Sequence, residues 1–145
     1  MTGYTISAYV ICPVRGQGGN ELLSGFIERI EKEGIKCHYP PRDVDQSSEG
    51  IDIVNAHLQA MMTSDLVMVW WDESSYGSHV DLGMALVASA RGAKLVRLNE
   101  YNCKMHSYGA VLKQISTPAI INFKDDYDKA LKIAAIAGID RKETK

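Results

Sequence analysis

Apolar residues along this chain follow two spacings, one typical of strands and one typical of amphipathic helices. The clearest strand is residues 66–71, LVMVWW, a run too short to cross a membrane but the right length for a strand buried on both faces. A polar loop follows at 72–78, and then a helix of small and apolar residues at 79–91. A second β-rich run at 95–98 comes after Gly92. We therefore expect one βαβ unit in this stretch.

The rest of the chain continues the alternation of strands and helices. The expected strands are 4–14, 35–39 and 119–123, and the expected helices are 21–34, 51–62, 110–115 and 126–137, with a polar loop at 42–50. Such alternation predicts a parallel sheet with helices on both faces. We expect an α/β fold with a single domain over residues 1–145. Its form is a flavodoxin-like three-layer sandwich with a five-stranded parallel sheet in the order 2-1-3-4-5.

Composition and charge restrict the class of partner. Hydrophobic residues make up 46% of the chain and charged residues 23%, as in ordinary soluble domains. A net charge of −2 leaves no basic excess for binding a nucleic acid polymer. The three cysteines, Cys12, Cys37 and Cys103, have no C-x-x-C spacing and predict free thiols in a reducing compartment. Without a basic leader or a membrane-length segment, we expect a cytoplasmic protein that has no membrane partner.

Two loops are expected to meet at one crevice, because ligands bind outside the carboxyl ends of the strands in open parallel sheets. The loops at 15–20 and 72–78 follow the first and third strands, which are neighbours in the expected order. The first loop contains Arg15, Gly16, Gln17 and Gly18. Its backbone N–H groups, its guanidinium and the helix that follows suit a phosphate. It matches neither the Walker loop nor G-x-G-x-x-G, so a flexible connection with a surface arginine is the alternative.

The second loop leads to two residues that have two interpretations. Ser78 and Asp81 have the spacing of a helix N-cap and its N3 acid, a capping-box variant that needs no catalysis. An acid at the mouth of a crevice, facing an anion-binding loop, is also where a nucleophilic carboxylate is expected. The spacing fits both interpretations, and only convergence of the two loops separates them.

Two further aspartates flank the buried strand. Asp72 leaves the strand at its carboxyl end, where it could bind sugar hydroxyls, hold a proton or simply be solvated. Asp65 stands at the opposite end, where a helix-to-strand turn residue is the more common role. Tyr9 in the first strand and the tryptophans at 70 and 71 suit core packing or stacking against a base.

The four histidines show no metal-ligand spacing with a cysteine or with one another, so we expect no metal site. His79 and Asp81 are two residues apart, which on a helix points them to different faces.

Three motifs resemble the nucleoside 2-deoxyribosyltransferase superfamily, which includes nucleoside 5′-monophosphate N-glycosidases. They are a first strand that ends in Pro-Val-Arg-Gly, the strand Ser-Asp-Leu-Val-Met-Val, and Gly-Ser-x-x-Asp-Leu-Gly-Met-Ala-Leu. The resemblance covers residues 9–98. In this superfamily a glutamate attacks the anomeric carbon and releases the base, and water or a second base then resolves the glycosyl ester.

The resemblance implies roles for individual residues. Asp81 takes the place of the nucleophilic glutamate, and Asp65 looks like an aspartate that the family keeps before its third strand. Asp72 is a further catalytic candidate because of its position at the carboxyl end of the strand. Ser78 falls near the family's phosphate or sugar contact, and Arg15 and Gly16 fall on the loop that holds the 5′-phosphate. The full set of expected substrate-binding residues is Tyr9, Pro13, Arg15, Gly16, Gln17, Gly18, Gly77, Ser78 and His79. We expect no cofactor. Family members are generally oligomeric, and their active sites are often completed by a neighbouring subunit, so we expect a homo-oligomer. The helix at 82–90 and the Met-rich end of the preceding helix are candidate contacts, although burial in the monomer core is the more common use of such residues.

One departure from the family bears on activity. Aspartate in place of glutamate retracts the carboxylate by one methylene, and a misplacement of roughly 1 Å can cost on the order of a hundredfold in rate. We expect an N-glycosidase or deoxyribosyltransferase acting on a nucleoside or its 5′-monophosphate. The alternative is a non-catalytic nucleotide-binding or regulatory module. A TIR-like glycohydrolase is a third possibility, but it requires a glutamate near the third helix that this sequence lacks.

Overall fold

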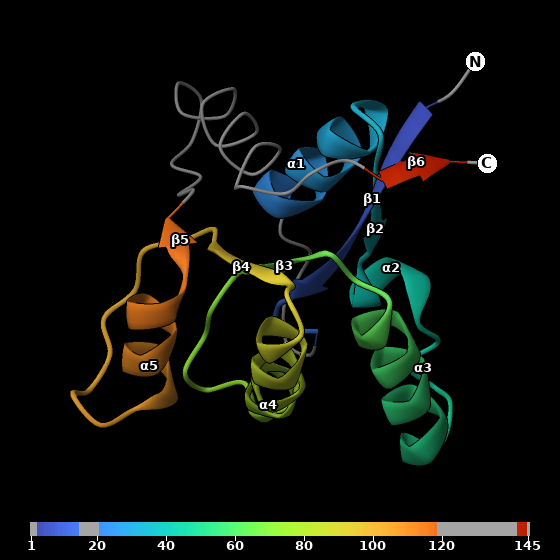
Figure 1. Ribbon diagram of the computed structural model, residues 1–145. Coiled ribbons are helices and arrows are strands. Elements are labelled where there is room, and N and C mark those ends of the chain that lie inside the picture. The colour runs from blue at the N-terminus through green and yellow to red at the C-terminus, as the bar shows by residue number, and fades with distance from the viewer. Residues whose placement is uncertain (1–2, 15–20, 119–141, 145) are drawn as a thin grey trace.

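The computed structural model describes residues 3–14, 21–118 and 142–144 (Figure 1). The elements run β1 (Gly3–Ile11), α1 (Glu21–Lys32), β2 (Ile35–His38), α2 (Pro40–Asp43), α3 (Gly50–Met62), β3 (Leu66–Val69), α4 (Tyr76–Ala90), β4 (Lys94–Arg97), α5 (Tyr108–Ile115), β5 (Thr117–Pro118) and β6 (Lys142–Thr144). The expected strand at 119–123 and helix at 126–137 lie outside the described residues.

Five parallel strands form the sheet in the order β2-β1-β3-β4-β5, which confirms the predicted topology. Tyr9 is central in this sheet, because it pairs with His38 of β2 on one side and Val67 of β3 on the other. The sequence analysis did not predict β6, which pairs antiparallel with the first residues of β1.

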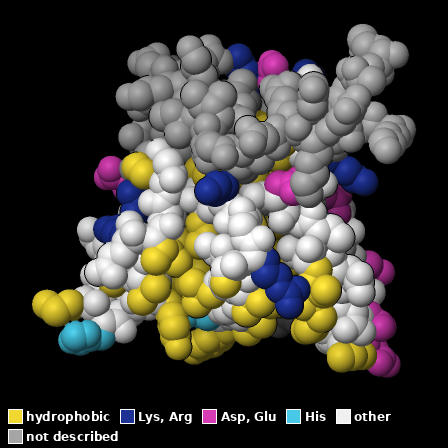
Figure 2. Space-filling model, in the orientation of Figure 1, with side chains coloured by type: hydrophobic (Ala, Val, Ile, Leu, Met, Phe, Trp, Pro, Cys, Tyr) yellow, Lys and Arg dark blue, Asp and Glu magenta, His cyan; other side chains and the backbone are white. Residues whose placement is uncertain are grey.

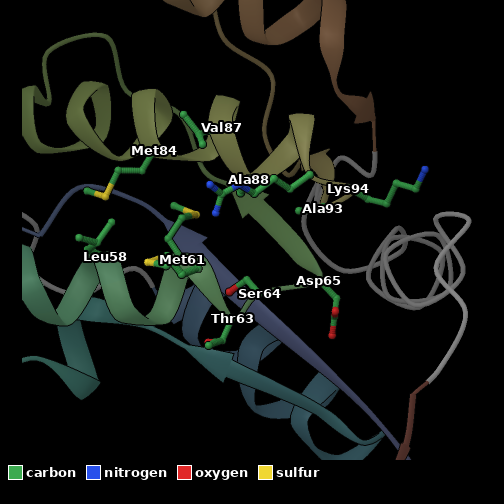
Figure 3. Close-up of a pocket in the computed structure, with 13 residues that line it drawn as sticks. Leu58, Met61, Thr63, Ser64, Asp65, Met84, Val87, Ala88, Ala93 and Lys94 are labelled. Carbon is green, nitrogen blue, oxygen red and sulfur yellow. The ribbon is translucent and has the colours of Figure 1, made fainter.

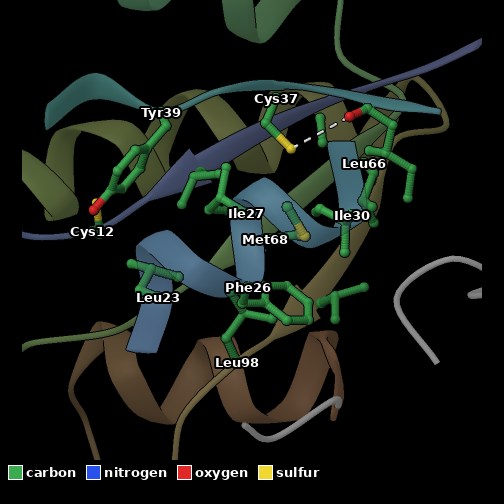
Figure 4. Packing of buried hydrophobic residues seen from close by; sticks show 14 of the residues in the cluster. Cys12, Leu23, Phe26, Ile27, Ile30, Cys37, Tyr39, Leu66, Met68 and Leu98 are labelled. Atoms are coloured by element: carbon green, nitrogen blue, oxygen red, sulfur yellow. Dashed lines mark hydrogen bonds between the residues drawn. The ribbon is translucent and has the colours of Figure 1, made fainter. Parts of the chain in front are cut away.

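Helices cover both faces of the sheet, with α1 on one face and α3, α4 and α5 on the other (Figure 1). Side chains alternate across β1, so Ile6, Ala8 and Val10 pack on the α1 side, where Phe26 and Ile30 fill the core (Figure 4). Tyr9 and Ile11 point to the opposite side with Leu82 and Ala85 of α4. The alternation therefore directs the hydroxyl of Tyr9 toward α3 and α4.

Helix α4 begins earlier than predicted. Its first residue is Tyr76 rather than His79, and Ser75 is the N-cap, whose side chain accepts a hydrogen bond from the backbone N–H of Ser78. Ser78 and Asp81 therefore both lie inside the helix. The capping-box interpretation of this pair is wrong, because the serine three residues earlier has that role.

The segment expected to be a polar loop at 42–50 begins with the last residues of α2. Pro40 starts this short helix, where its fixed φ and missing N–H cost nothing. Arg42 then binds Glu31 of α1 at 2.7 Å and donates to the carbonyl of Cys37 at 3.2 Å. These contacts fix the turn that leads from β2 toward α3.

The three cysteines are free, as predicted, and two of them are buried. The tryptophans also behave as expected, since Trp71 is buried on the α4 side and Trp70 packs partly buried on the α1 side. No helix in the described part of the chain is both long and apolar enough to span a membrane.

Candidate functional site

Asp81 is a buried carboxylate at the centre of a polar cluster between the sheet and two helices. It lies on the inward face of α4 and is only 5% exposed. Its Oδ2 accepts a hydrogen bond from the hydroxyl of Tyr9 at 3.0 Å. Its Oδ1 lies 3.2 Å from Nδ1 of His57, which belongs to α3. The carboxylate thus has one donor on each oxygen, from two different elements.

The ring of His57 is held edge-on to two other rings. Its centroid lies 6.0 Å from that of Tyr9 and 6.1 Å from that of His38, and both ring pairs are T-shaped. Tyr9 and His38, neighbours in the sheet, have centroids 5.2 Å apart. We call Tyr9, His38, His57 and Asp81 the Asp81 cluster.

Burial sets the protonation of Tyr9 and His38 in this cluster. Burial above all, and then the charge of Asp81 and its hydrogen bond, raise the pKa of Tyr9, which stays a donor at neutral pH. Burial also lowers the pKa of His38; the nearby His57 adds to this effect, while Asp43 and Asp81 oppose it. The pKa of the Cys12 thiol is raised to about 12, by burial first and then by Asp81, so this thiol is not a nucleophile at neutral pH.

Ser78 lies one turn before Asp81 on α4 and is also buried, at 1% exposure. Its Oγ has no hydrogen-bond partner among the described residues. Nε2 of His57 and Nε2 of His38 are likewise buried and unpartnered within that set. Buried polar atoms are normally satisfied, so three orphans around one carboxylate indicate a place where a ligand or water is bound.

The remaining described candidates lie on the loop after β3, at the start of α4 and after the end of β1. Oδ1 of Asp72 accepts hydrogen bonds from the backbone and hydroxyl of Ser74, and these bonds lower the pKa of Asp72. Gly77 follows the first residue of α4, with open space around it. Pro13 comes two residues after the end of β1 and is partly buried.

His79 faces a different side of α4 from Asp81, as predicted. Its ring lies 4.8 Å from that of Trp71 and 5.9 Å from that of Tyr108, measured between centroids. Its Nδ1 lies 2.8 Å from the carbonyl oxygen of Ser75, and its Nε2 lies 3.6 Å from Glu73. His79 thus belongs to an aromatic group between α4 and α5.

Asp65 stands at the amino end of β3, and its carboxylate accepts a hydrogen bond from the backbone N–H of Ser7. It lies at one end of a groove of about 550 Å³ between the last turns of α3 and α4. In this groove Leu58 and Met61 of α3 face Met84 of α4 (Figure 3). The side chain from the segment before β3 that reaches Asp81 is therefore His57, not Asp65.

The sequence analysis missed His57 and His38 because it tested histidines only for metal spacing. A helical signal pointed to His57, since it comes four residues before the buried Met61 on the same helix face. The candidates Arg15, Gly16, Gln17 and Gly18 lie outside the described residues, so convergence of the two loops stays a prediction. Within the described ranges no three His, Cys, Asp or Glu side chains form a metal-binding group.

Comparison with known proteins places the fold but not the family. No family model matches the sequence, and no curated protein matches it either. Among solved structures, the fold is similar to that of a CMP N-glycosidase of Clostridium botulinum, BcmB, with a TM-score of 0.58 and 17% identity. The match covers 88% of this chain and 96% of that one. At this identity the likeness shows that the chain shares the fold of a nucleotide-cleaving enzyme.

Proposed function

We propose that this protein cleaves the N-glycosidic bond of a nucleoside or nucleoside 5′-monophosphate, as a hydrolase or a deoxyribosyltransferase, with Asp81 as nucleophile. The observation that carries the proposal is the buried Asp81 carboxylate, held by one donor on each oxygen beside the unpartnered hydroxyl of Ser78. A CMP N-glycosidase with a similar fold supports the choice of substrate class. The family resemblance of the motifs around Ser78 and Asp81 supports the choice of nucleophile.

The reaction proceeds by double displacement. An oxygen of Asp81 attacks the anomeric carbon, and the carbon–nitrogen bond breaks with its electron pair leaving on the base, which takes up a proton. In the second step a water oxygen forms a bond to the anomeric carbon, its proton is released, and the ester bond breaks to restore the carboxylate. In a transferase, a nitrogen of a second base takes the place of the water.

Ser78, Gly77 and the backbone of residues 15–18 are assigned to the 5′-phosphate. Ser78 supports this assignment because its hydroxyl has no partner within the described chain. Asp72 is assigned to the sugar hydroxyls as an acceptor, because its lowered pKa keeps it ionised at neutral pH. Tyr9 and Pro13 remain assigned to substrate contacts, and no cofactor or metal takes part in the scheme.

The test is base release from a panel of nucleosides and nucleoside 5′-monophosphates that includes CMP, followed by chromatography. We expect free base from at least one member, and Asp81→Asn should stop the release while leaving ligand binding measurable. Asp45→Asn is the matched control, since that aspartate is exposed and bonds only within its own turn. No release from any member of the panel would contradict the proposal.

A non-catalytic nucleotide-binding module is the second candidate. Both oxygens of Asp81 are already engaged, and an aspartate reaches less far than a glutamate. This candidate predicts a higher melting temperature with a nucleoside monophosphate and no turnover.

We also propose that the protein assembles with a second copy of itself through the outer sides of α3, α4 and α5. We define the outer apolar surface as the exposed side chains of Ile51, Val54, Leu58, Met62, Val80, Val87, Tyr108, Val111 and Ile115. Figure 2 shows hydrophobic side chains gathered over these helices. Among the described residues, α1 on the opposite face contributes no exposed large hydrophobic side chain.

A second copy fits this surface better than a small ligand does. The apolar side chains are spread over three helices, with the groove of Figure 3 between two of them. Exposed charges of opposite sign stand at its two ends, Asp52 at the start of α3 and Arg91 after the end of α4. In a dimer with a two-fold axis through this surface, Asp52 of each copy lies toward the partner's Arg91.

A further inference from the structure

We propose that His57 is the positioning residue of Asp81, and that it donates its Nδ1–H to Asp81 Oδ1 and so fixes the carboxylate for attack. This inference rests on the proposed function, because it assigns His57 a part in the same reaction. No motif in the sequence marks His57, and its contact with Asp81 joins residues 24 positions apart on two helices.

The first step of the argument is the geometry of the carboxylate. A carboxylate that is held at one oxygen only can still turn about its Cβ–Cγ bond, which has a broad torsional minimum. Tyr9 holds Oδ2 from β1, and His57 holds Oδ1 from α3. Two donors from two rigid elements remove that freedom and leave each oxygen a free lone pair. A fixed carboxylate orientation matters more for an aspartate, because its shorter side chain places the carboxylate farther from the substrate than a glutamate would.

The second step concerns which nitrogen of the His57 ring carries a hydrogen. A carboxylate only accepts hydrogen bonds, so Nδ1 of His57 carries a hydrogen. Nε2 of the same ring is buried and has no partner among the described residues. The groups that face the ring are Tyr9 from β1, His38 from β2 and Asp81 from α4, and the lowered pKa of His38 keeps it uncharged at neutral pH.

The third step is the fixed orientation of the His57 ring. Its side chain is 14% exposed, and both Tyr9 and His38 meet it in T-shaped contacts. The ring therefore cannot turn its Nδ1 away from Asp81 without losing two aromatic contacts. A rigid donor of this kind is what a positioning role requires.

Three variants test the proposal. His57→Leu keeps the volume but removes the donor. His57→Asn keeps an amide N–H near the place of Nδ1, because an asparagine amide reaches about as far as Nδ1 of histidine. His106→Asn is the control, since His106 is exposed in the loop before α5. Each variant is assayed for kcat, KM and melting temperature on the best substrate of the panel.

We expect His57→Leu to lower kcat by about 100-fold, the usual cost of a misplaced reacting group, with KM changed less than about threefold. His57→Asn should recover kcat to within about tenfold of the wild type. His106→Asn should match the wild type.

Two outcomes overturn the positioning role alone. One is a wild-type kcat in His57→Leu. The other is an equal loss of kcat in His57→Leu and His57→Asn, which would mean that the ring only fills space and that its N–H has no part. A wild-type protein that releases no base contradicts the proposed function instead, and the positioning role with it. The two failures are therefore distinguished by the wild-type assay.

Discussion

The hydroxyl of Tyr9 donates a hydrogen bond to Oδ2 of Asp81 at 3.0 Å, and this bond links the middle strand of the sheet to helix α4. Neither residue is open to solvent, since Tyr9 is fully buried and Asp81 nearly so. The bond joins residues 72 positions apart, which the topology brings together because β1 lies next to β3 and α4 follows β3.

Tyr9→Phe removes this donor and keeps the ring. We expect the free energy of unfolding to fall by about 1–3 kcal/mol, the cost of leaving a buried charged acceptor short of a partner. Base release should slow as well, because the carboxylate keeps only the donor from His57. Urea unfolding measures the first effect, and the base-release assay measures the second. Tyr108→Phe is the control, since that tyrosine is exposed; equal stability of the two variants would contradict the prediction.

Asp81→Glu restores the side chain that the family resemblance leads one to expect. The added methylene has to fit between Tyr9 and His57, which both contact the shorter carboxylate. Overpacking of this kind costs about 1–3 kcal/mol, so we expect lower stability and slower base release than in the wild type. Thermal unfolding and the base-release assay together check this. A variant that is both stable and faster would mean that the surroundings of Asp81 are not fitted to aspartate.

The sheet could be predicted from the sequence because its strands are short apolar runs between clear breaks. All four residues of β3 are buried, and a strand covered on both faces needs a continuous apolar run. β6 could not be predicted, because it is a short polar segment. It pairs with Gly3–Thr5 of β1, which precede the residues of β1 that pair with β2 and β3.

The candidate site could be predicted only in part. Asp81 and Ser78 came from a local motif, and the structure buries both on one face of α4. The contact between His57 and Asp81 depends on how α3 packs against α4, and no short-range spacing encodes that packing. The sequence analysis considered Ser78 as the N-cap, but the N-cap is Ser75. Both serines are acceptable N-cap residues, and the extended backbone angles at Ser75 show that the helix begins after it.

Gly109→Ala tests the contact between α5 and the loop after β3. The backbone N–H of Gly109 donates to Oε1 of Glu73 at 3.1 Å, and a Cβ on this glycine would overlap that same oxygen. It would also lie 2.8 Å from Nε1 of the buried Trp71. We expect a loss of about 1–3 kcal/mol in the free energy of unfolding, because Glu73 must leave and the buried Trp71 must shift.

Gly83→Ala is the matched control for this substitution. Gly83 lies within α4, and nothing lies within 4 Å of its expected Cβ. Replacing a helical glycine by alanine stabilises by about 0.5–1 kcal/mol. The two variants should therefore change stability in opposite directions in urea unfolding, and a change of the same sign would contradict the packing around Gly109.

His38 makes the stability depend on pH in a defined direction. Burial lowers its pKa in the folded protein from the ordinary 6.5, so between these two values the unfolded chain binds more protons than the folded one. The contribution of neutral His38 to the free energy of unfolding is complete above about pH 6.5 and is lost as the pH falls toward the pKa of His38 in the folded protein.

His38→Gln removes this pH dependence. Comparing wild type and variant by urea unfolding at about pH 7.5 and about pH 5.5, we expect the wild type to lose more stability on acidification. Equal losses of stability in the two proteins would show that His38 binds a proton as easily in the folded protein as in the unfolded chain.

The outer apolar surface gives the last prediction. Leu58→Glu places a charge on the wall of the groove between α3 and α4, where the proposed partner copy packs. We expect the wild type to be an oligomer in light scattering at about 0.1 mM and the variant to be a monomer, because a buried unpaired charge costs more than a typical interface contact contributes. Lys32→Glu on α1 changes charge on the opposite face and should leave the assembly intact. A monomeric wild type at that concentration would contradict self-association, and an oligomeric Leu58→Glu would place the contact on another surface.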